Sequence, residues 1–220
     1  EKTLFLEVRT KLQEFVPYLM ELSNEVAYFD TIASYAQAAN LNRWIKPEIT
    51  DTYELNIQNA RHPVVEKYLP SGEFVPNPID ISANENEISF GLITGPNMAG
   101  KSTYLRQCAL ITLLAQTGSF VPADKATIGL VDKIFCRVGA SDNLARGEST
   151  FLVEMSETAL ILKSSTKRSL VIMDEVGRGT STEDGLSIAC AVSEFLLNTL
   201  KCRTLFATHY HELTRLEHKN

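Results

Sequence analysis

Residues 95–102 carry the strongest chemical signal in the sequence. They read Gly-Pro-Asn-Met-Ala-Gly-Lys-Ser and match the pattern GxxxxGK[ST] without exception. Glycines let backbone N–H groups turn inward around anionic oxygens, and the N-terminus of a following helix adds the positive end of its dipole. Lys101 would supply a cation for the β- and γ-phosphates of a nucleotide, and the Ser102 hydroxyl would bind Mg²⁺. The residues predicted to contact the nucleotide here are Gly95, Pro96, Asn97, Met98, Ala99, Gly100, Lys101, Ser102 and Thr103.

Two acids follow a second apolar run, at residues 169–175. Successive side chains of a strand point to opposite faces, so Asp174 and Glu175 cannot share one role. Asp174 is predicted to bind Mg²⁺, and Glu175, one step beyond the strand, is predicted to orient and deprotonate an attacking water. A strand that ends in surface acids is common. Downstream of a complete phosphate-binding loop, however, the pair indicates the Walker B site of a nucleotide hydrolase.

A histidine, His209, follows a third apolar run at residues 205–208. It would lie at the carboxyl end of a strand, where open α/β sheets place their ligands. A single histidine is more often structural than catalytic, but this position favours a sensor of the γ-phosphate.

The elements that must position these residues alternate between strand and helix. Apolar runs predict strands at 88–94, 132–137, 170–174 and 204–208, and helical spacing predicts helices at 102–117, 150–163 and 185–199. This alternation is typical of an α/β domain with a mostly parallel sheet flanked by helices. The phosphate-binding loop would then join the first strand of the sheet to its first helix, as the motif requires.

A helical segment precedes this domain. Apolar residues keep helical spacing over residues 3–42, with Pro17 expected to kink or divide the helix. Turn-forming prolines and glycines then separate short apolar pieces such as 54–57 and 79–81, which predict short strands. We therefore predict two parts, a helical segment at 1–46 and a nucleotide-binding domain at 47–220.

The composition narrows the class of protein. The 220 residues carry a net charge of −6, with a sequence pI of about 5.3 and no basic stripe, so any contact with nucleic acid must come mainly from other parts of the protein. No apolar run is long enough to cross a bilayer. The cysteines form no CxxC pair, which favours reduced cysteines in a cytosolic protein over a disulfide framework or a zinc site.

The chain resembles the ATPase domain of the bacterial MutS family of DNA mismatch-repair proteins, with the end of the helical core attached. The matching segments follow one another along nearly the whole chain. They are 61–66, 94–107, 137–144, 149–155, 174–182 and 206–210.

This resemblance implies roles that spacing alone does not give. It implies an ABC-ATPase-like P-loop NTPase fold, in which two such domains pair and complete each other's sites. Ser149 would reach the γ-phosphate bound by a partner, although a plain helix N-cap accounts for a serine there equally well on sequence grounds. Asn97 would contact the γ-phosphate, and residues 177–182 would cross the dimer interface. Phe74 would stack on adenine, although a loop phenylalanine can also fill a core, and His62 receives no role.

The resemblance also implies ligands and partners. The cofactors would be ATP or ADP with Mg²⁺, and the partners a second copy of the domain, mismatched duplex DNA held by domains outside this segment, and the repair protein MutL. The location would be the bacterial cytoplasm at the nucleoid, and the segment would end before the C-terminal dimerisation helices. Three positions depart from the family pattern and leave the electrostatics of the interface open. These are Ala99, Glu148 and Glu183.

Two functions of different classes follow. The first is an ATP hydrolase that converts ATP and water to ADP and phosphate, with Lys101, Glu175, His209 and a partner's Ser149 in the catalytic site, and so switches the conformation of a DNA clamp. The alternative is a nucleotide-gated dimerisation module that hardly hydrolyses ATP by itself. Another ABC-like ATPase lacks support, because the sequence has no LSGGQ-type signature and no long coiled coil.

Overall fold

The computed structural model describes residues 1–70, 72–96, 99–138 and 150–219. The chain divides into two compact units, Glu1–Arg43 and Trp44–Asn220. This division falls a few residues before the predicted boundary at 46/47, and the assignment of the two parts to a helical core and an ATPase domain stays a prediction.

The first unit is helical, as predicted. It consists of α1 (Lys2–Leu12), a short 3₁₀ turn η1 (Gln13–Phe15) and α2 (Val16–Asn42). Pro17 does not interrupt α2, because it lies in the first turn of this helix, where the missing N–H has no intrahelical partner in any case. The break in the helix falls just before the proline, at η1.

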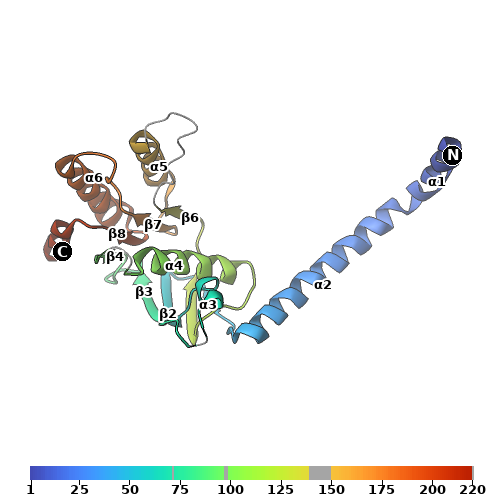
Figure 1. Ribbon diagram of the computed structural model, residues 1–220, viewed down its shortest axis with the longest axis horizontal. Coiled ribbons are helices and arrows are strands. Elements are labelled where there is room, and N and C mark those ends of the chain that lie inside the picture. Colours follow the sequence, from blue (N-terminus) through green and yellow to red (C-terminus); the bar gives the residue numbers. More distant parts are fainter. Residues whose placement is uncertain (71, 97–98, 139–149, 220) are drawn as a thin grey trace. The chain divides into compact units, whose positions relative to one another are not determined.

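A parallel four-stranded sheet forms the frame of the second unit. Its strands are β4 (Phe90–Ile93), β8 (Arg203–Ala207), β7 (Leu170–Asp174) and β6 (Ile134–Arg137), side by side in that order (Figure 1). All three pairs are parallel, with Leu92 opposite Phe206 and Asp174 opposite Ala207. The four strands predicted from apolar runs are confirmed. The loop after β4 and the acids after β7 therefore lie at the same edge of the sheet.

Helices cover both faces of this sheet. On one face, α4 (Lys101–Gln116) packs Leu105 and Ile111 into a cluster with Leu170 and Ile172 of β7. On the other face, α5 (Thr150–Ser164) and α6 (Thr182–Glu194) share a cluster with the alternate β7 residue Val171. The alternation along β7 explains why its run is apolar throughout, since both of its faces are buried. The helix predicted at 185–199 ends as a π-helical turn, η3 (Phe195–Leu200).

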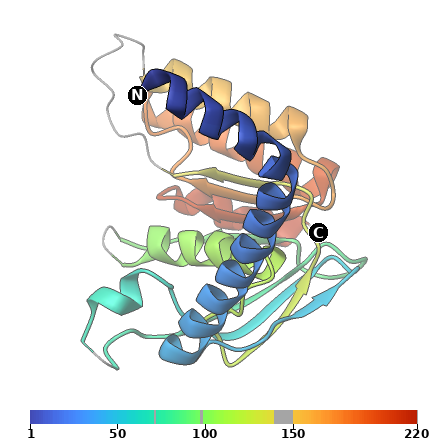
Figure 2. The same cartoon turned by 90° about the vertical axis from the view of Figure 1, so that its right-hand side faces the viewer.

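A second sheet was not predicted as a separate layer. It is mixed, in the order β1 (Glu48–Thr50), β5 (Lys125–Gly129), β2 (Glu54–Ala60), β3 (Asn77–Ser82); β1 and β5 are parallel and the other pairs antiparallel. Its apolar side chains join the cluster around α4, so α4 lies between the two sheets (Figure 2). The remaining elements are the short α3 (Val65–Tyr68) and the 3₁₀ segment η4 (His211–Lys219). Over the part of the chain that the structure describes, no helix combines the length and the apolar character needed to cross a membrane.

A buried arginine joins the two sheets. Arg203, at the start of β8, is fully buried, and its guanidinium donates to the carbonyls of Gly129 at 2.7 Å, Leu130 at 2.9 Å and Arg168 at 2.5 Å. Burial, and then the charge of Arg168, lower the pKa of Arg203 to about 10, so it stays charged at neutral pH. Its hydrogen bonds fix the N-terminal end of β8 against the end of β5.

We expect Arg203→Met to destabilise the fold strongly. The replacement keeps an apolar stem of similar length but leaves one buried and two partly buried carbonyls without their donor, which should lower the free energy of unfolding by about 2 to 4 kcal/mol. Denaturant unfolding measures this difference. The matched control is Lys125→Met, at an exposed position on β5, and equal stability of the two variants would contradict the assignment.

Candidate functional site

The loop predicted to bind phosphate lies between β4 and α4, as the sequence predicts. Gly100, with φ of +89°, sits in the left-handed region that favours glycine, immediately before Lys101. Lys101 is buried, and its Nζ donates to the carbonyls of Gly95 at 2.7 Å and Pro96 at 2.9 Å. The ammonium group is therefore held inside the curve of the loop, at the N-terminus of a 16-residue helix. This is the arrangement that binds phosphate groups.

Ser102 and Asp174 meet across the edge of the sheet. The Ser102 Oγ donates to Asp174 Oδ2 at 2.6 Å, although 72 positions separate the two residues. Asp174 is buried, and its Oδ1 has no hydrogen-bond partner among the described residues. A buried carboxylate oxygen without a partner is costly. This oxygen therefore indicates a place for a ligand.

The donor set fits Mg²⁺. This ion prefers oxygen ligands and usually keeps several waters, so that the protein supplies only one or two groups besides the phosphates. A hydroxyl and a carboxylate at hydrogen-bond distance meet that requirement. Within the described residues no group of three or more histidine, cysteine or acidic side chains could hold a metal ion, so a site built by the protein alone is not present there.

Glu175 follows the last residue of β7, Asp174, and its backbone is no longer extended. Its backbone has φ of +57°, an uncommon conformation for a residue other than glycine, and its N–H donates to Ala207 O at 2.9 Å. Its carboxylate contacts His209 Nε2 through one oxygen and Arg178 Nη1, at 2.5 Å, through the other. The structure thus brings Glu175 and His209 together, whereas the role of His209 as a phosphate sensor stays a prediction.

The Glu175 carboxyl has a pKa below its ordinary value. Burial acts to raise this pKa, but the hydrogen bonds and charges of His209 and Arg178 outweigh burial. The side chain is therefore ionised at neutral pH, as a group that accepts a proton must be. Because the folded-state pKa is lowered, the contribution of this group to stability is present above its ordinary pKa and is lost as the pH falls through the folded value.

The loop after Glu175 passes very close to α6. A Cβ atom added to Gly177, whose φ is +89°, would lie 2.5 Å from the carbonyl oxygen of Gly185. A Cβ atom added to Gly185 would collide with the Tyr210 hydroxyl and with Gly177 O. The Tyr210 hydroxyl also donates to Gly177 O at 3.2 Å. This packing leaves room only for glycine at both positions.

Phe74 lies beside the phosphate-binding loop. It lines a pocket of about 310 Å³ together with Gly100, Lys101 and Thr103. Its half-buried ring is available at one wall of this pocket, where the adenine of a nucleotide held by the loop could stack. A second pocket, of about 220 Å³, contains Glu175 and His209.

Several predicted residues lie outside the described residues. They are Asn97 and Met98 of the loop, Glu148, and Ser149, which immediately precedes α5. Of the departures from the family pattern, Ala99 and Glu183 are exposed. His62 is buried, and its Nδ1 accepts the N–H groups of Val64 and Val65, both at 3.2 Å. His62 therefore closes a local turn, a role that the sequence did not suggest.

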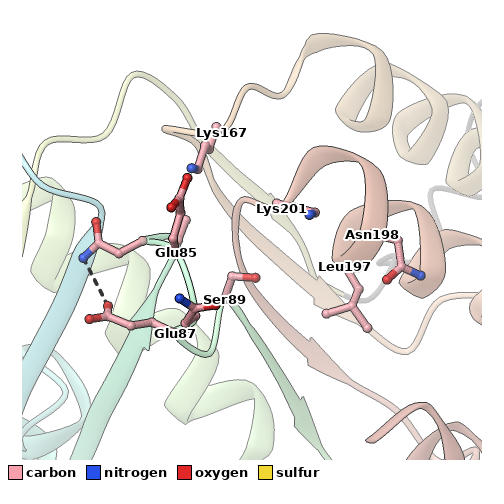
Figure 3. A pocket seen from close by; sticks show the side chains of 10 residues that line it. Glu85, Glu87, Ser89, Lys167, Leu197, Asn198 and Lys201 are labelled. Atoms are coloured by element: carbon pink, nitrogen blue, oxygen red, sulfur yellow. Dashed lines mark hydrogen bonds between the residues drawn. The ribbon is translucent and has the colours of Figure 1, made fainter. Parts of the chain in front are cut away.

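A larger pocket lies at the opposite edge of the parallel sheet. It measures about 470 Å³ and is bounded by the turn before β4, by Lys167 before β7 and by the end of η3. Glu85 points toward Lys167, and Lys201 and Asn198 lie across the opening (Figure 3). Open α/β sheets bind ligands at the carboxyl ends of their strands. This pocket lies at the amino ends, and its mixed charges match no motif in the sequence.

Sequence reasoning missed two contacts of Glu175 and its loop. The contact of Arg178 is hard to predict from the sequence, because a cation three residues after an acid is common on surfaces. A contact of Glu154 is easier to predict, because it is an acid within the apolar run 151–155 at the start of α5. It is buried, and its Oε1 accepts the Gly177 N–H at 2.6 Å.

Comparison with known proteins adds independent information. The family model described as MutS domain V matches residues 91–220. The DNA mismatch repair protein MutS of Treponema denticola is 64% identical over 227 residues, which cover 100% of this chain and 26% of that protein. The corresponding proteins of Treponema pallidum (strain Nichols) and Clostridium perfringens are 60% and 55% identical, over 99% of this chain and 24% of each protein. The chain spans about a quarter of the length of these relatives.

Proposed function

Because the chain belongs to the MutS family of DNA mismatch repair proteins, we propose that it binds ATP with Mg²⁺ and hydrolyses it to ADP and phosphate. The fold would be that of an ABC-ATPase-like P-loop NTPase. The parallel order β4-β8-β7-β6 and the glycine-rich loop between β4 and α4 support this proposal.

One observation carries the proposal. The hydroxyl that follows Lys101 lies 2.6 Å from the carboxylate at the end of β7, which unites the phosphate-binding loop with the Walker B strand. A glycine-rich turn, or a strand that ends in acids, also occurs in proteins that bind no nucleotide. Together, at one edge of a parallel sheet, the two motifs would supply a cation for the phosphates of a nucleoside triphosphate and oxygen ligands for its Mg²⁺.

Each residue then has a distinct part in the reaction. The loop N–H groups and Lys101 would bind the β- and γ-phosphates, and the Phe74 ring would support the adenine. Glu175 would orient the attacking water in line with the γ-phosphate and take its proton, with His209 beside it as the sensor of the γ-phosphate. Ser102 and Asp174 would hold Mg²⁺, which supplies positive charge to the phosphate oxygens.

Ser149 of a second copy would complete the site, as the family resemblance implies. We also propose that nucleotide state is transmitted to mismatched DNA held by other parts of the natural protein, with MutL as a later partner. Such a protein would work in the bacterial cytoplasm at the nucleoid.

We expect ATP turnover to require pairing of two chains. If Ser149 acts across the interface, turnover per chain should fall by about tenfold or more on dilution from a dimeric to a monomeric range. Sedimentation with and without ATP locates these ranges, and a phosphate-release assay gives turnover. Turnover per chain that stays constant through the monomeric range would contradict the shared site. ATP-dependent dimers without turnover would favour the alternative, a nucleotide-gated assembly module.

A further inference from the structure

Glu154 is a buried acid whose contact the proposed reaction does not use. It lies in the first turns of α5, is 6% exposed, and its Oε1 accepts the backbone N–H of Gly177 at 2.6 Å. Burying a carboxylate is costly unless it accepts hydrogen bonds. Because this hydrogen bond is made to the backbone of Gly177, it constrains the backbone of the loop itself.

That loop determines where Glu175 points. Gly177 follows Glu175 by two residues, and the left-handed backbone of Glu175, with φ of +57°, costs free energy that the surroundings must offset. Three groups hold Gly177 in place: Glu154 on its N–H, the Tyr210 hydroxyl on its carbonyl, and the backbone of Gly185 against its Cα. Of these, only Glu154 comes from α5.

A second residue of α5 contacts the same loop. A Cβ atom added to Gly179 would lie 3.2 Å from the Phe151 Cβ, so Phe151 and the loop are in close contact. Phe151 and Glu154 are three positions apart and therefore lie on one face of the helix. Thr150, the first residue of α5, directly follows Ser149. A shift at the start of α5 would thus reach the loop of Glu175 through two side chains.

We infer that Glu154 is a positioning residue for Glu175. By accepting the Gly177 N–H, it fixes the loop that sets the conformation of Glu175, and it couples that conformation to the start of α5. The expected effect of Glu154 on catalysis rests on the proposed function. The contact with Gly177 and its effect on the loop do not depend on that function.

The test compares Glu154→Gln with Glu154→Met in the intact chain. Glutamine keeps an acceptor oxygen at the same reach, whereas methionine has a similar length without a strong acceptor. We expect Glu154→Met to lower kcat by about 10- to 100-fold, with the Kd for ATP within about threefold of the parent. Glu154→Gln should recover most of kcat. Hydrogen exchange of the Gly177 amide, followed by NMR on glycine-labelled protein, should be at least about tenfold faster in the methionine variant only.

Ser156→Ala, at an exposed position on the same helix, is the control for general effects on α5. Unchanged exchange at Gly177 in Glu154→Met would overturn the inference, and so would a kcat equal to that of the parent. A Glu154→Gln variant as slow as Glu154→Met would also overturn it, because the acceptor would then not matter. A parent that shows no ATP turnover would instead refute the proposed function, while the exchange measurement would still decide whether Glu154 fixes the loop.

Discussion

Replacing Lys101 with alanine should greatly weaken ATP binding. The Lys101 ammonium is held within the loop by the carbonyls of Gly95 and Pro96, at the N-terminus of α4. If the loop binds ATP as proposed, removal of Lys101 would leave the β- and γ-phosphates without a cation that is largely shielded from water. We expect affinity for ATP to fall on the order of 100-fold, or about 3 kcal/mol. Titration calorimetry or a fluorescent ATP analogue measures the change.

The control for this experiment is Lys125→Ala, which removes an exposed cation of the same unit. It should bind ATP like the parent. Thermal unfolding of both variants separates a lost contact from a lost fold. If Lys101→Ala binds Mg²⁺-ATP with parental affinity while folded, the loop at 95–102 is not the phosphate site.

Replacing Glu175 with alanine should leave ATP binding intact and remove turnover. The Glu175 carboxylate contacts Arg178 and His209, whereas Ser102 and Asp174 contact each other, so the change should leave the residues proposed to hold phosphate and Mg²⁺ in place. Without a group to take the proton of the attacking water, turnover should fall by about 100- to 10,000-fold. The strained backbone at position 175 is not a complication, because alanine and glutamate are equally disfavoured at a positive φ.

A coupled phosphate assay at saturating ATP, run beside a binding titration, separates these two effects. Glu212→Ala changes an exposed acid in η4 and serves as the matched control. Parental turnover by Glu175→Ala would remove the assignment of Glu175 as the base. A parallel loss of binding would show that its contacts support the loop rather than the reaction.

The parallel sheet could be predicted because its strands are apolar on both faces. A short run that is apolar throughout, such as β7, is typical of a strand buried on both faces. The carboxyl ends of parallel strands meet at one edge of the sheet, so the approach of Ser102 to Asp174 could also be predicted. The mixed sheet could not be predicted in the same way. Its strands β1 and β5 are short and carry polar residues, and their pairing depends on partners far along the chain.

The contacts of Glu175 escaped prediction for a different reason. Strand alternation gives the direction of a side chain only while the backbone stays extended, and at Glu175 the backbone changes to the left-handed conformation. That turn brings the carboxylate to Arg178 and His209. The burial of Glu154 likewise depends on the loop after β7, whose path is set by glycines rather than by a periodic pattern.

The close approach of Gly177 to Gly185 has a genetic consequence. Every missense change of a glycine codon adds at least a Cβ atom, and at either position that atom would overlap the backbone of the other glycine. Every amino-acid substitution at these two positions should therefore disturb the packing of the loop against α6. Missense mutations that cause loss of function should therefore be found at these two codons, even though glycine has no side chain that could contact ATP.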